Sequence, residues 1–162
     1  MALGPVRLRL LRVPTAEREE LAIHQLEPEA ASVPEARRLA CEFVGPLMSE
    51  EQISHLSVAI TEVVANSVRH SGSSEGIRLM LTRKDDYLCV RVTDGGNGLV
   101  PQPGAMSSEP GAGFGLFLVE QMTRRWGVTR EDGRTRVWFE INYAEGGGAN
   151  GAAPTDAPCD PV

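Results

Sequence analysis

The sequence predicts a single α+β domain, a two-layer sandwich in which a mixed β-sheet is covered by helices on one face. Three observations predict it. The chain has 162 residues, 41% of them hydrophobic, which suits one domain with its own core. Its expected elements follow in the order β, α, α, β, β, α, β, β. Turn sequences typical of hairpins join neighbouring strands, whereas a doubly wound parallel sheet would alternate strands with helices.

The working domain is expected to span residues 20–143. Residues 1–19 form an N-terminal extension whose structure the sequence does not indicate. Residues 144–162 consist mostly of Gly, Ala, Pro and Asp. Such a segment cannot bury enough apolar surface to offset its ordering entropy, so we expect a disordered tail.

The charge balance excludes some classes of partner. Lys and Arg number 16 against 22 Asp and Glu, a net charge of −6. An acidic chain lacks the basic footprint of a nucleic-acid-binding protein and is not attracted to anionic membranes. No apolar run is long enough to span a bilayer, and arginines interrupt the apolar N-terminus, which excludes a signal peptide. We therefore expect a cytoplasmic protein that contacts neither nucleic acid nor membrane directly.

The first half of the domain is expected to contain one strand and two helices. Partial alternation of apolar residues indicates a strand over 21–26. The tetrapeptide SVPE at 32–35 is a capping-box sequence and predicts a helix over 32–48. A second capping box, SEEQ at 49–52, predicts a helix over 50–71, where apolar residues recur at helical spacing.

A hairpin and a long loop are expected next. The β-rich runs 76–82 and 87–93 flank a Lys-Asp-Asp turn at 84–86. Residues 94–113 are rich in Gly and Pro and show no periodicity. Loops of this length inside a compact domain are uncommon and usually functional.

The last part of the domain predicts a helix and a second hairpin. Apolar residues at helical spacing indicate a helix over 114–126. Residues 127–131 and 136–142 are β-rich and flank Asp132-Gly133. An Asp-Gly pair between two such runs is a strong local signal for a tight hairpin turn.

Polar side chains on the second helix form the first candidate site. Glu62, Asn66 and His70 are spaced four residues apart and therefore share one helix face. A carboxylate and a carboxamide one turn apart can serve as a base and a ligand for a hard metal ion. The same spacing is also typical of an ordinary solvated face.

Two glycine-rich segments form the other candidates. Asp94 follows a strand directly, where its carboxylate can accept an amino group of a base, although Asp-Gly is also a common turn. Gly111, Gly113 and Gly115 lead into a helix, whose exposed N–H groups and positive end can cradle phosphates. Their spacing fits neither the dinucleotide-binding fingerprint nor a P-loop, and a plain linker remains the alternative.

The order of these three segments resembles the N, G1 and G2 boxes of the GHKL (histidine-kinase-like) ATPase superfamily, over about residues 20–143. Within it, TEVVANSVRHSG at 61–72, RWGV at 125–128 and TRVWFE at 135–140 are similar to the stand-alone bacterial anti-sigma-factor serine/threonine kinases. The resemblance implies a Bergerat-type ATP-binding fold.

The resemblance also implies roles for single residues. Glu62 would be the general base, Asn66 the protein ligand of Mg²⁺, and Asp94 the acceptor of the adenine amino group. Residues 99–110 would form a lid over ATP. The other implied nucleotide contacts are Gly96, Gly98, Gly111, Gly113, Gly115, Leu116 and Thr135.

By the same resemblance, the chain would be a homodimeric, ATP-binding serine/threonine protein kinase that regulates transcription. It would phosphorylate an anti-anti-sigma-type partner and sequester a sigma factor. The segment 99–110 contains no Lys or Arg to neutralise phosphates, and Arg69, Lys84 and Arg125 are the candidate substitutes. The alternatives are a slow or non-catalytic ATP-dependent protein-binding module and a partner-only regulator whose pocket is degenerate.

Overall fold

The computed structural model describes residues 20–70, 75–84, 86–96 and 114–143. The expected extension 1–19 and tail 144–162 lie outside these residues. The elements in chain order are β1 (Glu20–Leu26), α1 (Ser32–Val44), a 3₁₀ turn (Gly45–Leu47), α2 (Glu50–His70), β2 (Ile77–Arg83), β3 (Tyr87–Asp94), α3 (Phe114–Met122), β4 (Arg125–Glu131) and β5 (Arg134–Asn142).

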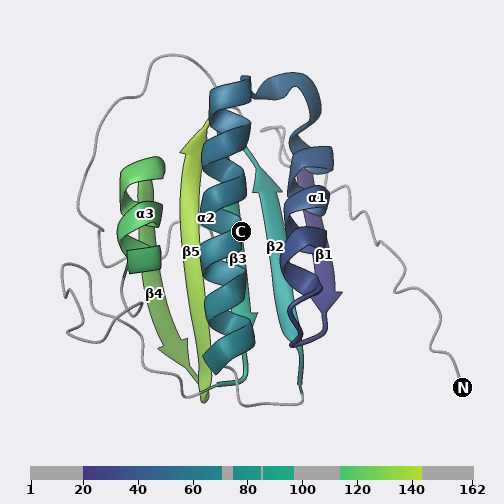
Figure 1. The fold of residues 1–162 in the computed structure, drawn as a ribbon, viewed down its shortest axis with the longest axis vertical. Helices are drawn as coiled ribbons and strands as arrows, with labels where there is room; N and C mark the ends of the chain where they lie inside the picture. Colours follow the sequence, from purple (N-terminus) through teal and green to yellow (C-terminus); the bar gives the residue numbers. More distant parts are fainter. Residues whose placement is uncertain (1–19, 71–74, 85, 97–113, 144–162) are drawn as a thin grey trace, which may run out of the picture.

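The fold is the expected two-layer α+β sandwich. Five strands form one sheet in the order β1-β2-β3-β5-β4, and Figure 1 shows α1, α2 and α3 side by side on one face of it. All four strand pairings are antiparallel, so the expectation of a mixed sheet is wrong. The two helices between β1 and β2 return the chain to the end of β1, and β5 separates β3 from β4, which run in the same direction.

The core lies between the sheet and the helices. Alternate residues of each strand point to this layer, and the apolar stripe of α2 covers its centre. The largest fully buried apolar side chains are Phe139, Leu56, Ile60, Ile77, Leu79, Leu81, Leu88, Val44, Val63, Val64 and Val90. Together they fix the position of α2 over β3 and β5.

The start of α1 differs from the sequence expectation. Ala31 is the residue before the helix, and no side chain caps it. The Ser32 hydroxyl instead donates to the Glu27 carbonyl at 2.6 Å. The helix also ends earlier than predicted, at Val44, because Gly45 adopts a positive φ of 53°, which L residues disfavour.

The start of α2 confirms the second capping box. The Gln52 amide donates to Ser49 Oγ at 3.3 Å, and the Ser49 amide donates to Gln52 Oε1 at 2.9 Å. These two bonds satisfy N–H groups that the first turn of a helix leaves without partners. The long helix that carries Glu62 and Asn66 therefore begins at a fixed residue.

The helix predicted over 114–126 is shorter in the structure and ends at Met122. The Arg124 amide donates to the Glu140 carbonyl at 2.8 Å, and Arg125 begins strand β4.

The Asp132-Gly133 hairpin is confirmed. Both residues have positive φ, 52° and 72°, as the tight primed turns of hairpins require.

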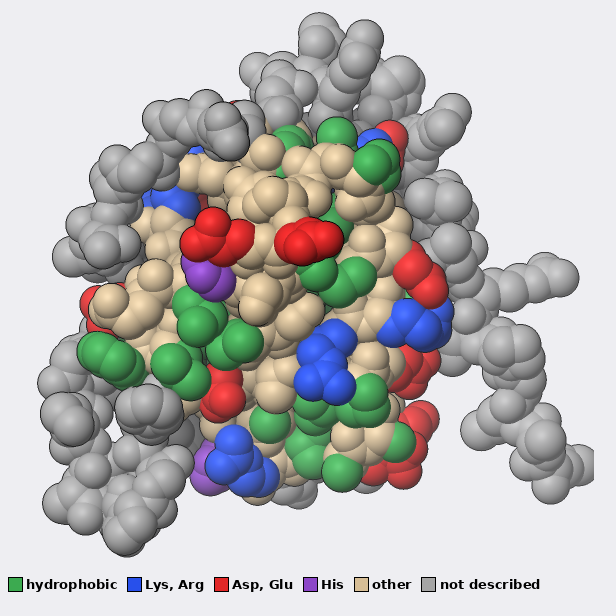
Figure 2. All heavy atoms as spheres, turned by 45° about the horizontal axis from the view of Figure 1, so that its top comes forward, with side chains coloured by type: hydrophobic (Ala, Val, Ile, Leu, Met, Phe, Trp, Pro, Cys, Tyr) green, Lys and Arg blue, Asp and Glu red, His purple; other side chains and the backbone are tan. Residues whose placement is uncertain are grey.

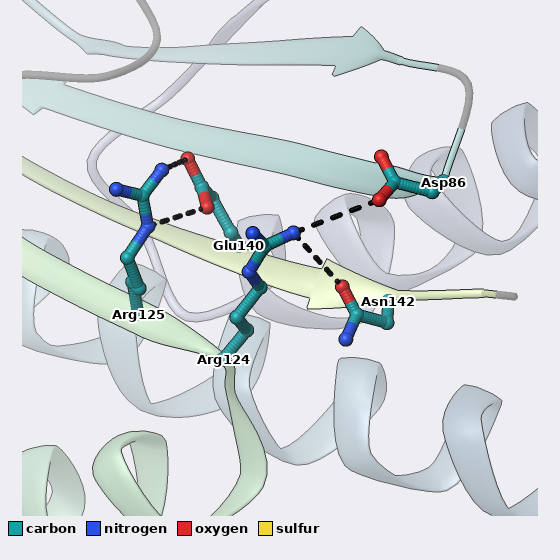
Figure 3. A network of polar contacts seen from close by, with 5 residues as sticks. All are labelled: Asp86, Arg124, Arg125, Glu140 and Asn142. Atoms are coloured by element: carbon teal, nitrogen blue, oxygen red, sulfur yellow. Dashed lines mark hydrogen bonds and ion pairs between the residues drawn. The ribbon is translucent and has the colours of Figure 1, made fainter. Parts of the chain in front are cut away.

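The other face of the sheet is not covered by the described helices and carries a polar network (Figure 3). Arg125 donates to both carboxylate oxygens of Glu140, at 2.8 and 2.9 Å, and Glu140 is fully buried. This bond is the main cause of the raised pKa of Arg125. Arg124 contacts Asn142 at 3.4 Å and Asp86 at 3.8 Å.

Charge on the helix-covered side is mixed. Figure 2 shows acidic, basic and hydrophobic side chains lying there in small separate groups. Among the described residues, no helix is both long and apolar enough to cross a bilayer.

Candidate functional site

The described site candidates come from four elements: α2, the end of β3, the first turn of α3 and the start of β5. In Figure 1, α3 lies beside α2, and β3 ends at the lower edge of the sheet, where β5 begins. Two pairs of segments far apart in the sequence are thus brought together: α2 with the start of α3, and the end of β3 with the start of β5. Gly98, Gly111, Gly113 and the expected lid 99–110 lie outside the described residues.

Glu62 and the start of α3 are in direct contact. A Cβ atom added to Gly115 would overlap Glu62 Oε2 and lie 3.2 Å from the Glu62 carboxyl carbon. Only glycine therefore lets the first turn of α3 approach this carboxylate so closely. The N-terminal end of a helix favours negative charge, so the carboxylate lies where an anionic group is stabilised.

Asn66 lies one turn further along α2 and has a cationic neighbour. Arg69 Nη2 donates to Asn66 Oδ1 at 3.2 Å, and Arg69 Nε donates to the Ala65 carbonyl at 3.2 Å. An amide oxygen has two lone pairs, so Asn66 Oδ1 retains capacity for a second partner. This side of the site thus contains a hard oxygen ligand beside a guanidinium group.

The positions of the other two candidate cations do not suit this region. Arg125 is bound to Glu140 on the opposite face of the sheet. Lys84 lies between β2 and β3, where its amide donates to the Tyr87 carbonyl, whereas Asp94 is at the opposite end of β3. Of the three cations considered from the sequence, Arg69 is the one that the fold places beside the α2 candidates.

Asp94 belongs to a buried corner at the end of β3. Its Oδ1 accepts the Gly96 amide at 2.9 Å, and the Thr135 hydroxyl donates to the Gly96 carbonyl at 2.9 Å. Asp94 and Thr135 are also direct partners in the β3–β5 register. Both side chains are about 7% exposed.

The geometry of this corner is compatible with both interpretations of Asp94, a capped turn and an acceptor for a ligand. The carboxylate caps its own turn through Oδ1, as the turn interpretation requires. An ionised carboxylate has about four acceptor positions, so Oδ2 retains the capacity to accept a donor from a ligand. The Thr135–Gly96 bond joins residues 39 positions apart, and no local sequence pattern indicates such a contact.

Leu116 and His70 have different surroundings. Leu116 is 5% exposed and belongs to the hydrophobic core, so only its backbone could contact a ligand. His70 is the last residue of α2 and is exposed. Among the described residues, no cluster of three or more His, Cys, Asp or Glu side chains could hold a metal ion. A metal at Asn66 would need oxygen ligands from a bound molecule and water.

Comparison with known proteins identifies the family and the fold. A family model described as the histidine kinase-like ATPase domain matches residues 26–141. A search of curated proteins finds no significant match. The structure of the RsbU and RsbW domains of Rv1364c from Mycobacterium tuberculosis matches with a TM-score of 0.59 and 19% identity. The match covers 80% of this chain but 33% of that chain.

Because the family model covers most of its length, the chain belongs to the histidine kinase-like ATPase domain family. Membership implies that the domain binds ATP. The structural likeness, at 19% identity, shows the shared fold.

Proposed function

We propose that this chain is an ATP-dependent serine/threonine protein kinase of the anti-sigma-factor type. It phosphorylates an anti-anti-sigma-type protein partner, sequesters a sigma factor and so regulates transcription, in the cytoplasm and as a homodimer. Family membership and the likeness to a structure that contains an RsbW domain support the proposal. The contact between the Glu62 carboxylate and Gly115 carries it, because it joins the candidate base to the glycine segment that would hold phosphates.

Asp94 selects the base of the nucleotide in this proposal. Its buried carboxylate accepts the adenine amino group, while Thr135 and Gly96 hold the corner in place. Gly98, like Gly96, allows the backbone to approach the flat ring. A hydrogen bond to a charged group contributes about 1.5–3 kcal/mol, enough to favour adenine over guanine, which presents an oxygen at that position.

Asn66 fits a Mg²⁺ site with a single protein ligand. Its Oδ1 has capacity for a second partner, and Mg²⁺ commonly keeps several waters and takes other oxygens from phosphates. When bound, the ion would neutralise phosphate charge. Arg69 supplies a second positive charge next to Asn66. Gly111, Gly113, Gly115 and the Leu116 backbone bind the phosphates at the start of α3.

Glu62 acts as the general base in this proposal. It accepts the proton of the partner's serine or threonine hydroxyl as that oxygen attacks the terminal phosphorus of ATP. The new P–O bond forms while the bond to the bridging oxygen breaks, and ADP leaves with that electron pair. The products are a phosphorylated partner, ADP and a proton.

A second candidate function is a slow or non-catalytic ATP-dependent protein-binding module. The observation that favours it is the segment 99–110, which contains no Lys or Arg. Arg69 is also already bonded to Asn66 and Ala65. Nucleotide binding is common to both functions, and phosphate transfer separates them.

The first experiment is a calorimetric titration of ATP with and without Mg²⁺. We expect Asp94→Asn to weaken binding about tenfold or more, because the asparagine N–H₂ can face the adenine amino group. Asn66→Ala should remove the effect of Mg²⁺ on ATP affinity. Asp86→Asn, a matched change at an exposed aspartate, should behave as wild type. Wild-type affinity in Asp94→Asn would refute the adenine assignment, and a Mg²⁺ effect in Asn66→Ala would refute the metal assignment.

Phosphate transfer is then measured with the purified partner and γ-labelled ATP. Glu62→Ala should lose transfer while ATP affinity changes little. Glu42→Ala, which removes an exposed carboxylate from α1, is the matched control. Transfer that persists in Glu62→Ala would contradict the role of this residue, and tight ATP binding without transfer in wild type would favour the binding module.

A further inference from the structure

A cavity of about 480 Å³ opens on the face of the sheet that the described helices leave uncovered, here called the helix-free face. It lies where β3 and β4 end and β2 and β5 begin. The strand register explains why these residues meet, since Arg78 pairs with Thr93, Thr93 with Arg136 and Arg136 with Thr129. Its lining consists of Arg78, Met80, Arg91, Thr93, Thr129, Glu131, Asp132, Arg134 and Arg136.

Arginines outnumber carboxylates in this lining. Four arginines face two acidic side chains, in a chain whose net charge is −6. Arg136 contacts Glu131 at 3.6 Å, and Arg134 contacts Glu75, outside the lining, at 3.1 Å. Arg78 forms no ion pair within the part of the chain that the structure describes. Arg78 therefore adds positive charge to the cavity that no ion pair among the described residues neutralises.

Two buried polar atoms of the same cavity lack hydrogen-bond partners. Neither Thr129 Oγ1 nor Arg136 Nε has one among the described residues. The two residues are direct partners in the β4–β5 register, so both atoms lie in the same part of the cavity. Buried donors without acceptors are rare in folded proteins, and an oxygen-rich ligand would satisfy both.

We propose that this cavity binds a phosphate monoester. Guanidinium groups match phosphate oxygens with paired hydrogen bonds, and the threonine hydroxyl is a further donor. The volume exceeds that of a phosphate ion and lies in the range of ligand pockets, and Met80 provides an apolar wall for the organic part of the ester. The ligand comes either from a small phosphorylated molecule or from a phosphorylated serine of a protein.

This proposal goes beyond the proposed function. Arg78, Thr93 and Arg134 also line a smaller pocket that contains Asp94, but most of the cavity faces away from the proposed ATP site. Arg134 and Arg136 flank Thr135 in β5, and adjacent residues of a strand point to opposite faces. The Thr135 hydroxyl reaches Gly96, whereas the two arginines line the cavity. A failure to bind ATP would refute the proposed function but not the phosphate cavity. A failure to bind phosphate monoesters would refute the cavity proposal but not the proposed function.

The test is a titration of the full-length protein followed by two-dimensional amide NMR. The probes are glycerol 3-phosphate and a short peptide with one phosphoserine, each compared with acetate and with the unphosphorylated peptide. We expect the phosphate probes to shift amide signals within 129–136 and 91–93, with smaller changes at 62–66. The probe that binds more tightly identifies the source of the ligand.

Charge removal locates the site. The double variant Arg78→Gln/Arg134→Gln changes two exposed side chains and should weaken binding of the phosphate probes about tenfold or more. The double variant Arg78→Lys/Arg134→Lys keeps the positive charge but loses the paired hydrogen-bond geometry of guanidinium. Its affinity for the phosphate probes should lie between that of the double glutamine variant and that of wild type. Arg38→Gln, an exposed arginine of α1, should bind as wild type does.

Three results would overturn the proposal. The first is the absence of shifts with both phosphate probes. The second is an equal response to acetate or to the unphosphorylated peptide. The third is a loss of affinity in Arg38→Gln as large as in the double glutamine variant, because binding would then depend on overall charge alone.

Discussion

The two ends of the helix-free face carry the same kind of side chain in opposite electrostatic settings. At one end, Arg125 forms a two-bond pair with the fully buried Glu140. Arg124 contacts Asn142 and Asp86 and lies 5.4 Å from the centre of the Tyr87 ring. At the other end, four arginines share a cavity with two carboxylates. The polar groups of the first end form ion pairs and hydrogen bonds with one another, whereas at the second end Thr129 Oγ1 and Arg136 Nε have no hydrogen-bond partner among the described residues.

This difference shows that an arginine's role depends on its partners more than on its burial. Removing one member of a buried ion pair leaves the other charge without compensation, which destabilises a fold strongly. Buried hydrogen-bond donors without acceptors lower the stability of the fold, but they can bind a ligand that supplies acceptors. We therefore expect substitutions at the two ends to change stability in opposite directions.

The largest effect is expected at the paired end. Glu140→Ala removes the buried carboxylate and leaves Arg125 without its partner, so the free energy of unfolding should fall by about 3–5 kcal/mol. Urea denaturation measures it. Glu42→Ala breaks the exposed Arg38–Glu42 pair and should cost about 0.5 kcal/mol or less. Equal losses in the two variants would remove the distinction between a structural pair and a surface pair.

A smaller effect of opposite sign is expected at the cavity end. Thr129→Val replaces a buried hydroxyl, which has no hydrogen-bond partner in the described part of the chain, with a methyl group of similar size. In the absence of ligand, stability should rise by about 1 kcal/mol. Thr123→Val is the matched change, because the buried Thr123 hydroxyl donates to the Val119 carbonyl at 2.6 Å. That variant should lose stability. A loss in Thr129→Val would mean that its hydroxyl is satisfied in solution.

The smallest effect is expected in the pH dependence of the paired end. Burial, with the Glu140 charge adding to it, raises the pKa of Tyr87 above its ordinary 10.0. The protonated phenol is therefore favoured in the folded state. Its stabilising contribution is fully present below pH 10 and is lost as the pH rises through the folded-state pKa. Tyr87→Phe should lose less stability than wild type between neutral pH and pH 11, as followed by urea midpoints. An unchanged slope would place Tyr87 outside the electrostatic network.

Local signals in the sequence predicted much of the fold. The Ser49–Gln52 capping box and the Asp132-Gly133 turn depend on residues within four positions of one another, and both are confirmed. Ser32 shows the limit of such signals, because its hydroxyl bonds the Glu27 carbonyl instead. Trp126 fits the apolar spacing of α3, but its pairing with Phe139 places it in β4, and no local pattern contains that partner.

The candidate site has the same limit. The spacing of Glu62 and Asn66 indicated a shared helix face, but the glycine that contacts Glu62 is 53 positions further along the chain. The order of the three motifs supplied that connection through the family resemblance. The arginine cavity draws on four strands, and its residues carry no motif. The roles of the site residues remain proposals that the titrations test.

The two hydrogen bonds of the Gly96 backbone have a consequence for the rate of amide hydrogen exchange with solvent. Its amide donates to Asp94 and its carbonyl accepts from Thr135, so a residue beyond the last residue of β3 is held as firmly as the strand itself. Its amide hydrogen should therefore exchange with deuterium at the slow rate of the sheet. Thr135→Val removes the second bond and should speed that exchange. The exchange rate of one amide would thus report how often this corner of the sheet opens.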